Sequence, residues 1–191
     1  MNKDIKQFLP KRPTESHKGM FGHVLNIAGS EFYTGAAYFS SVAPLRVGCG
    51  RSTLTAPDTV LKTVSALTPD VILSPLTKAQ ENIKSGNYEA VSVGCGLSVN
   101  EASIEFFSEL IKVLNEYRVP VVVDADGLNI LSELKLTKLP VHTILTPHPK
   151  EFERIAGTFN DHYSRNIAQI ELSAKHKIII VLKGAFSAIS F

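Results

Sequence analysis

The chain has 191 residues, which is enough for one domain with a sizeable hydrophobic core. Its apolar content of 44% and charged content of 20% are ordinary for a soluble globular protein. The net charge of +2 argues against a dedicated nucleic-acid binder, because such a protein would carry a clustered basic face. Arg12, Lys18, Arg46 and Arg51 are scattered along the sequence and are interpreted as ordinary surface charges.

The sequence carries no membrane or disulfide signature. No stretch approaches the roughly 20 apolar residues that a membrane-spanning helix needs, and the N-terminus lacks the pattern of a signal peptide. These absences predict a chain without membrane contact and a cytoplasmic location. Cys49 and Cys95 have neither the spacing of a zinc pair nor that of a redox CxxC motif, so both are interpreted as small buried residues.

Short apolar runs alternate with amphipathic stretches along the chain. Residues 1–20 are polar and contain Pro10, Pro13 and Gly19, which predicts a short helix or arm followed by a loop. Runs rich in Val and Ile predict strands at residues 24–28, 52–55, 71–73, 90–93, 119–123, 143–145 and 178–182. Amphipathic stretches predict helices at residues 35–47, 58–67, 77–85, 101–117, 126–134, 149–156 and 162–176. This order predicts an α/β fold with a doubly wound, mostly parallel sheet flanked by helices.

Three local features refine this prediction. Asn100 is the expected N-cap of the helix at 101–117, and Pro44 is expected to kink or split the helix at 35–47. After a tight turn a further strand begins near residue 188, and the chain stops inside it. A last strand of this kind would leave an unprotected edge, so we expect residues 1–191 to be one domain that is incomplete at its C-terminus.

Glycine-containing loops follow two of the predicted strands. Gly29 allows a tight exit from the first strand, and Gly35 and Ala36 begin the next helix without side-chain bulk. Backbone N–H groups at such a helix start could meet an anion. Gly94 and Gly96 follow the strand at 90–93, where a backbone could approach a pyrophosphate closely. In both loops the alternative is that the glycines serve only packing or a plain turn.

Carboxylates follow the strand at 119–123. Asp124 and Asp126 could hold Mg²⁺ through water or orient a hydroxyl group. The alternative is that Asp126 caps the next helix while Asp124 accepts backbone hydrogen bonds.

The last two strand ends carry charged and polar groups. Pro147 ends the strand at 143–145, which places His148 where it could contact a ligand and Glu151 in the first turn of a helix, where the dipole also favours a carboxylate. Lys183 leaves a buried strand beside Gly184 and could meet a phosphate, or it could be an exposed lysine in a β-turn. Strand ends of a parallel sheet share one edge, so these loops are expected to form one composite site. The other histidines show no metal-like spacing and are interpreted as ordinary residues: His17, His23, His142, His162 and His176.

An ordered set of motifs carries a family resemblance. The motifs are HKG at 17–19, IAGS at 27–30, GAA at 35–37, LRVGCG at 45–50, VGCGL at 93–97, VDADGLN at 123–129, LTPHPKEF at 145–152 and VLKG at 181–184. In this order they resemble the ribokinase-like enzymes, and more closely the NAD(P)H-hydrate dehydratases of the YjeF C-terminal type. The match runs from about residue 17 to residue 187, with Pro44 and Cys95 as tolerable departures.

The resemblance implies a ribokinase-like fold and a metabolite-repair reaction. Such enzymes take the hydrated forms of NADH and NADPH, called NADHX and NADPHX, and use ADP or ATP to dehydrate them to the working cofactor. The hydroxyl group is phosphorylated and then expelled as phosphate. Mg²⁺ is the implied cofactor, ADP or ATP the implied co-substrate, and an NAD(P)H-hydrate epimerase the implied functional partner. A homo-oligomer is also expected from the family, whereas the choice between ADP and ATP stays open.

The resemblance also assigns roles to residues. Ala36, Gly96 and His148 match positions that contact the hydrated nicotinamide nucleotide, and Glu151 matches a glutamate linked to Mg²⁺ and phosphate. The same cleft is expected to include Gly35, Gly94, Asp124, Asp126 and Asn129. The segment that matches an adenine-nucleotide contact consists of Lys183, Gly184, Ala185, Phe186 and Ser187. No catalytic residue is assigned, because the chain stops before the family's Gly-Thr-Gly-Asp signature, which supplies an anion hole and an activating Asp. We therefore expect the intact protein to be a dehydratase and this chain alone to be inactive.

Two alternatives remain open from the sequence. The first is a small-molecule kinase of the same fold, such as a thiazole or hydroxymethylpyrimidine kinase, which would leave a stable phosphoester. His148 favours the dehydratase, because those kinases tend to carry Asn at that position. The second alternative is a non-catalytic nucleotide-binding or scaffold relative, and the absent Gly-Thr-Gly-Asp signature favours it.

Overall fold

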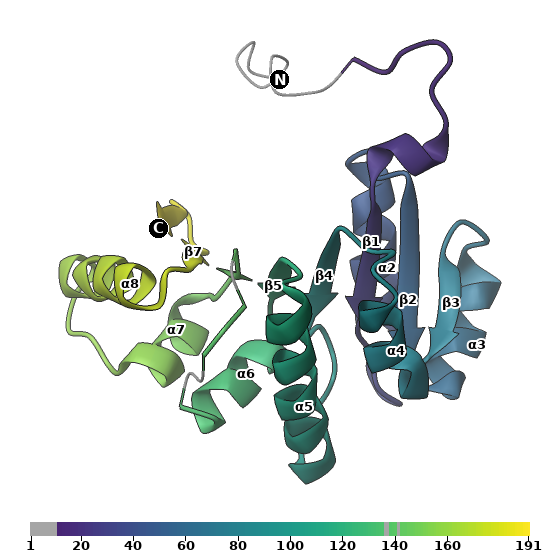
Figure 1. Cartoon of the computed structure of the whole chain (residues 1–191). Helices are drawn as coiled ribbons and strands as arrows, with labels where there is room; N and C mark the ends of the chain where they lie inside the picture. Colours follow the sequence, from purple (N-terminus) through teal and green to yellow (C-terminus); the bar gives the residue numbers. More distant parts are fainter. Residues whose placement is uncertain (1–10, 136–137, 141) are drawn as a thin grey trace.

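The computed structural model describes residues 11–135, 138–140 and 142–191, which build one sheet with helices packed on it (Figure 1). Within these residues the sheet has eight strands in the order β3-β2-β1-β4-β5-β6-β7-β8. All neighbours pair in parallel except β7 and β8, which are antiparallel. The strands are β1 His23–Ile27, β2 Arg51–Ala56, β3 Ile72–Pro75, β4 Ala90–Val93, β5 Val121–Val123, β6 Ile144–Leu145, β7 Ile179–Leu182 and β8 Ala188–Ser190. The predicted α/β fold with a mostly parallel sheet is therefore confirmed.

Each predicted helix is present at nearly its predicted position. The helices are α2 Thr34–Arg46, α3 Asp58–Leu67, α4 Ala79–Lys84, α5 Glu101–Tyr117, α6 Asp126–Glu133, α7 Pro149–Ala156 and α8 His162–His176. A short 3₁₀ turn, η2 (Leu76–Lys78), precedes α4 in the segment predicted as a single helix. Another 3₁₀ turn, η1 (Lys18–Phe21), lies where a loop was expected. Residues 1–10 of the predicted helix or arm lie outside the described residues.

Two predictions about helix details have opposite outcomes. Asn100 caps α5 in a reciprocal capping box with Ser103, as predicted. The predicted split at Pro44 is wrong, since α2 continues through it to Arg46. Pro44 lies in the last turn of α2, so its missing N–H removes a single hydrogen bond near the helix end.

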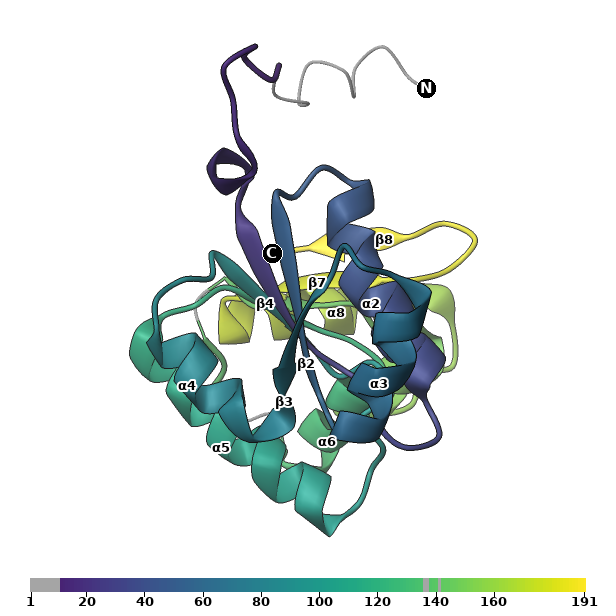
Figure 2. The same ribbon diagram turned by 90° about the vertical axis from the view of Figure 1, so that its right-hand side faces the viewer.

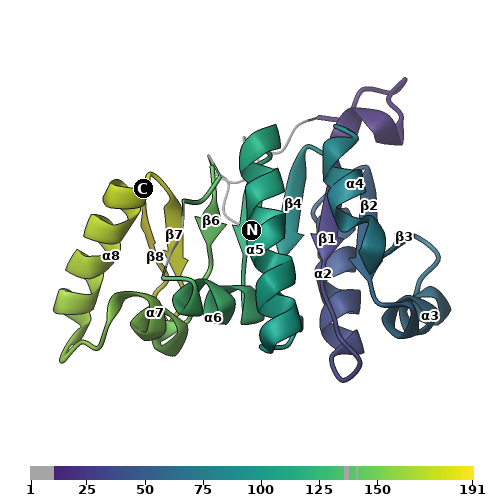
Figure 3. The same cartoon turned by 60° about the horizontal axis from the view of Figure 1, so that its bottom comes forward.

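The two faces of the sheet are covered unequally. Helices α4 to α8 pack on one face, where Val91, Val121 and Val123 belong to the larger hydrophobic core (Figure 3). Helices α2 and α3 pack on the other face beside β1 and β2, around Leu54 and Val60 (Figure 2). Farther along that second face, side chains that project from β4 to β7 stay partly exposed: Ser92, Val122, Ile144, Ile179 and Val181. None of the helices in the described residues is long and apolar enough to cross a membrane.

Candidate active site

Five loops meet at the carboxyl edge of the sheet, as the parallel arrangement requires. Backbone hydrogen bonds join neighbouring loops directly: Gly29 N–H donates to the Cys95 carbonyl at 2.8 Å, and Thr146 N–H donates to the Val123 carbonyl at 3.2 Å. Lys183 N–H donates to the Pro147 carbonyl at 2.8 Å. The loops after β1, β4, β5, β6 and β7 therefore form one continuous surface along this edge of the sheet, as the sequence predicted. We call this surface the composite edge.

The glycines of the β4 loop are required by packing between these loops. A Cβ on Gly94 would lie 2.0 Å from the Asp124 carbonyl oxygen, and one on Gly96 would lie 2.9 Å from the Ala36 Cβ. Both glycines also have positive φ angles, 126° and 69°. Gly35 differs, because a Cβ there would have no neighbour within 4 Å. Packing thus explains Gly94 and Gly96, whereas Gly35 faces open space at the start of α2.

Asp124 and Lys183 connect the β5 and β7 loops through their side chains. The Lys183 ammonium donates to Asp124 Oδ1 at 2.7 Å, and the same oxygen accepts the Ala125 N–H at 2.9 Å. The side chains of Asp124 and Lys183 are 32% and 42% exposed, so both remain accessible to a ligand. Lys183 is thus partly exposed, as in the β-turn alternative, but it also has a carboxylate partner.

Asp126 holds the β4 loop in place. Its Oδ2 accepts the Ser98 N–H at 2.9 Å, and its Oδ1 lies 3.5 Å from the Asn129 amide nitrogen. Asn129 in turn accepts a 2.6 Å hydrogen bond from the Arg154 guanidinium. The alternative in which Asp126 caps the next helix is wrong, because Ala125 is the N-cap of α6 and the Asp126 side chain bonds to none of the backbone N–H groups at its start. The preceding residue, Ala125, has a φ of 51°, a costly conformation for a residue other than glycine.

His148 and Glu151 form a capping box at the start of α7. His148 Nδ1 accepts the Glu151 N–H at 3.3 Å, and Glu151 Oε2 accepts the His148 N–H at 2.8 Å. Because Nδ1 is an acceptor, a neutral His148 ring carries its proton on Nε2. The Glu151 side chain is only 8% exposed and the His148 side chain is 47% exposed. His148 is therefore the member of the pair that can reach a ligand.

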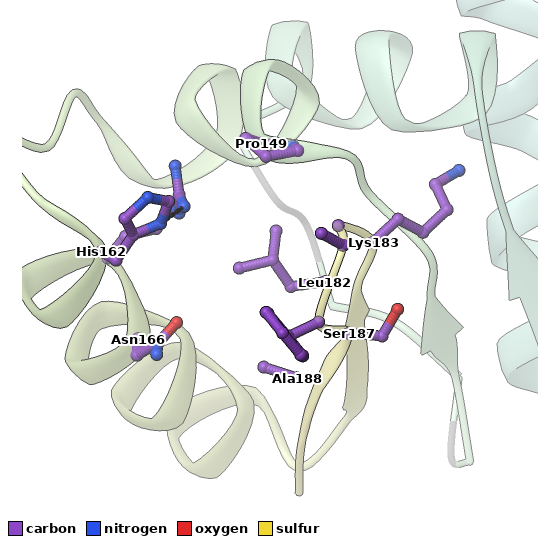
Figure 4. A pocket seen from close by; sticks show the side chains of 11 residues that line it. Pro149, His162, Asn166, Leu182, Lys183, Ser187 and Ala188 are labelled. Atoms are coloured by element: carbon purple, nitrogen blue, oxygen red, sulfur yellow. Dashed lines mark hydrogen bonds between the residues drawn. The ribbon is translucent and has the colours of Figure 1, made fainter.

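A cavity of about 580 Å³ lies between α8 and the turn that joins β7 to β8 (Figure 4). Pro149 and the turn residues 183–188 line it, together with three residues of α8: His162, Arg165 and Asn166. In Figure 4 the Lys183 side chain points away from the cavity, in keeping with its bond to Asp124. Phe186 is 96% exposed at the tip of the turn. The five residues expected to contact a nucleotide, Lys183 to Ser187, thus form one wall of a cavity at the composite edge.

Sequence reasoning missed several residues of this edge. His162 was interpreted as ordinary, and neither Arg165 nor Asn166 was considered, yet all three line the cavity. Their spacing of three and four residues on one helix face was the available signal. Arg154, which holds Asn129, lies 25 positions away in the chain, and nothing in the sequence pattern linked the two.

Cys95 lies in the β4 loop but has the chemistry of a packing residue. Burial, followed by the nearby negative charge of Asp124, raises the pKa of the Cys95 thiol. A raised pKa keeps the thiol neutral and weakly nucleophilic near pH 7. Both cysteines are free, and each is half-buried where the sequence predicted two buried residues.

The carboxylates of the edge suit magnesium bound together with phosphate. Among the described residues no three His, Cys, Asp or Glu side chains gather into a metal site. Mg²⁺ commonly binds through one or two carboxylates while water and substrate phosphate complete its shell. Asp124, 32% exposed at the end of β5, could be such a carboxylate, whereas Glu151 is 8% exposed and bonded to the His148 N–H, so it would have to leave that bond to reach an ion.

The fold is that of an α/β protein of the ribokinase-like class. A ribokinase-like superfamily protein from Enterococcus faecalis superposes with a TM-score of 0.86 at 21% identity, over 100% of this chain and 67% of that one. At that identity the likeness shows the fold alone. A hydroxyethylthiazole kinase from Pyrococcus horikoshii is more distant, with a TM-score of 0.58 and 13% identity over 91% of this chain and 59% of that one.

The chain belongs to the NAD(P)H-hydrate dehydratase family, whose family model matches residues 24–191. A bifunctional NAD(P)H-hydrate repair enzyme of Thermofilum pendens is 31% identical over 95% of this chain and 37% of its own length. The ADP/ATP-dependent NAD(P)H-hydrate dehydratase of Bacillus subtilis, co-crystallised with ATP and Mg²⁺, has a TM-score of 0.81 and 29% identity. That alignment covers 96% of this chain and 65% of the Bacillus chain. The chain therefore spans about a third to two thirds of the length of these relatives.

Proposed function

We propose that the whole protein dehydrates NADHX and NADPHX to NADH and NADPH with ADP or ATP as phosphoryl donor. The observation that carries this proposal is the 2.7 Å bond between Lys183 and Asp124. This bond joins the cavity of about 580 Å³ to the β5 loop that carries Asp124 and Asp126. One ligand in the cavity and a second on the composite edge would therefore meet at Lys183 and Asp124. A reaction that transfers a phosphoryl group between two nucleotides needs such adjacent subsites.

The residues of the edge suit two different ligands. We assign the adenine nucleotide to the cavity beside Lys183, Gly184, Ala185, Phe186 and Ser187. We assign the hydrated nicotinamide to the part of the composite edge formed by Gly35, Ala36, Gly94, Gly96, Asp124, Asp126, Asn129 and His148. The open space at Gly35 and the exposed ring of His148 support the second assignment.

The charge balance of the edge fits phosphoryl transfer. Phosphorylation would convert the substrate hydroxyl from a poor leaving group into a good one. Departure of phosphate with the C–O bonding electrons, together with loss of a proton from the adjacent ring carbon, would then restore the nicotinamide double bond. Mg²⁺, when bound with the nucleotide, would neutralise phosphate charge. Asp124 would be its accessible carboxylate, and Glu151 could join it after leaving the His148 N–H. Lys183 would leave Asp124 for a phosphate oxygen, and the His148 Nε2–H would donate a hydrogen bond to the substrate.

Further proposals concern the partner activity, the oligomeric state and the location of the protein. We propose functional pairing with an NAD(P)H-hydrate epimerase activity, which the bifunctional name of the Thermofilum relative supports. Homo-oligomerisation and a cytoplasmic location remain predictions from the sequence.

A product assay tests the proposal against the kinase alternative. The whole protein, rather than residues 1–191 alone, is incubated with hydrated NADH, Mg²⁺ and either ADP or ATP, and the absorbance of NADH and the phosphate released are both followed. Nucleotide-dependent recovery of NADH with one phosphate per NADH is the expected result. A stable phosphoester of a small alcohol, without recovery of NADH, would instead identify a kinase. Nucleotide binding with neither product would leave only a binding protein.

A further inference from the structure

Three basic side chains from separate segments line one cavity at the amino-terminal edge of the sheet. Arg12 precedes η1, Lys18 begins η1, and Arg51 begins β2. Their cavity has a volume of about 470 Å³ and is completed by Leu45, Cys49, Gly50, Pro69, Asp70 and Ile72. Arg12 and Lys18 are exposed, as predicted for surface charges, but together with Arg51 they share one cavity that the sequence did not indicate. The candidate active site follows the carboxyl ends of the strands, so this cavity lies at the opposite edge.

Close backbone contacts hold the three segments together. Gly50 N–H donates to the Phe21 carbonyl at 2.9 Å, and a Cβ on Gly50 would lie 1.7 Å from the Lys18 carbonyl oxygen. The Arg12 guanidinium donates to the Gly48 carbonyl at 2.6 Å and lies over the Phe21 ring at 4.1 Å. The segments and the Arg12 side chain are therefore positioned before any ligand arrives, which lowers the entropic cost of binding.

The positive charge of the cavity lacks a matching negative charge. Among the described residues, Arg12, Lys18 and Arg51 make no ion pair, and Asp70 is the single carboxylate among the residues that line the cavity. Arg51 Nε is buried and has no hydrogen-bond partner in the described part of the chain. A buried guanidinium nitrogen without an acceptor is unfavourable, so an anion that accepts from it would stabilise the site.

We propose that this cavity binds the phosphate group of a small phosphorylated molecule. Arginine presents a planar fork of donors that matches phosphate oxygens, and lysine adds a point charge. A volume of about 470 Å³ exceeds what one phosphate fills, and the apolar side chains of Leu45 and Ile72 can contact an uncharged remainder. The proposal is independent of the dehydratase reaction, because none of its residues belongs to the candidate active site.

Calorimetric titration at constant ionic strength tests the proposal with three probes: inorganic phosphate, pyrophosphate and glycerol 3-phosphate. We expect saturable binding that weakens about tenfold or more in Lys18→Gln and in Arg51→Gln, the loss expected when one charged hydrogen bond is removed. Arg51 is partly buried, so Arg51→Gln could destabilise the fold. Lys18 is exposed, so Lys18→Gln tests the proposal without that risk. Arg46→Gln is the matched control, since Arg46 is a neighbouring exposed arginine outside the cavity.

Amide chemical shifts locate the bound anion. Shifts in residues 48–51 would support the proposal, and a larger effect of glycerol 3-phosphate than of phosphate would identify a phosphoester as the ligand. Shifts confined to residues 183–187 would mean that the probes enter the candidate active site, and would overturn the proposal. An equal loss of binding in Arg46→Gln, or no saturable binding, would overturn it as well.

Discussion

Gly94 and Gly35 were both expected to contact substrate, and substitution by alanine should separate their roles. A Cβ on Gly94 would lie 2.0 Å from the Asp124 carbonyl oxygen, and the backbone there has a φ of 126°. Steric overpacking and backbone strain each cost about 1–3 kcal/mol, so Gly94→Ala should destabilise the fold by about 2–6 kcal/mol. Such a loss is a large part of the total stability of about 5–15 kcal/mol that is typical of proteins.

Gly35→Ala should have the opposite effect on stability. No neighbour lies within 4 Å of its Cβ position, and Gly35 stands in the first turn of α2. Alanine there should stabilise the protein by about 0.4–1 kcal/mol, because it reduces the freedom of the unfolded chain. If the open space belongs to the nicotinamide ligand, the same methyl group should weaken substrate binding.

Urea unfolding followed by circular dichroism measures both effects, since the chain contains no tryptophan for fluorescence. Substrate affinity is then compared between Gly35→Ala and the unmodified protein under conditions where both are folded. A Gly94→Ala variant as stable as the unmodified protein would refute the close contact with Asp124. A Gly35→Ala variant that is stable and binds substrate normally would refute the role of Gly35 in the site.

Three further substitutions test charges. Asp124→Asn should tighten ADP binding measured without Mg²⁺ by up to about fivefold, because the partly exposed ion pair that Asp124 forms with Lys183 is worth at most about 1 kcal/mol. Lys183→Gln should instead weaken ADP binding about tenfold or more. Weaker ADP binding in both variants would contradict the idea that Asp124 and the ADP phosphates compete for Lys183. Burial, followed by the charge of Arg51, lowers the pKa of His23 below 6.5 in the folded protein. As the pH drops through 6.5, His23 of the unfolded chain is protonated before His23 of the folded protein, so the free energy of unfolding should fall. His23→Gln should reduce this loss in urea titrations at about pH 7.5 and 5.5, and an unchanged pH dependence would assign the effect elsewhere.

Sequence reasoning recovered the features that depend on local pattern. Apolar runs located the strands, and parallel topology then placed Asp124, His148 and Lys183 at one edge. Contacts between distant segments left no such pattern. The bond from Arg154 to Asn129 and the convergence of Arg12 with Arg51 depend on how loops fold back, which spacing along the chain does not encode. The same limit explains why Asp126 looked like a cap when it holds the β4 loop instead.

Adjacent valines of β5 test the unequal covering of the sheet. Val123 is fully buried under the helices of the larger core, whereas Val122 projects from the opposite face and is only partly buried. Valine and threonine have nearly the same shape, so substitution exchanges a methyl group for a hydroxyl group with little steric change. Val123→Thr should cost about 1–3 kcal/mol, because its hydroxyl enters an apolar core.

Val122→Thr should cost much less, since water can reach its hydroxyl from the groove of about 380 Å³ that Val122, Val24 and Val47 help to line. Urea unfolding at several protein concentrations measures both variants. If both substitutions lower the free energy of unfolding equally at every protein concentration, the second face of the sheet excludes water as well as the first. That result would contradict the unequal covering of the two faces. A cost for Val122→Thr that rises with protein concentration would instead show that copies of the chain bury this face in each other, because association contributes to stability by mass action.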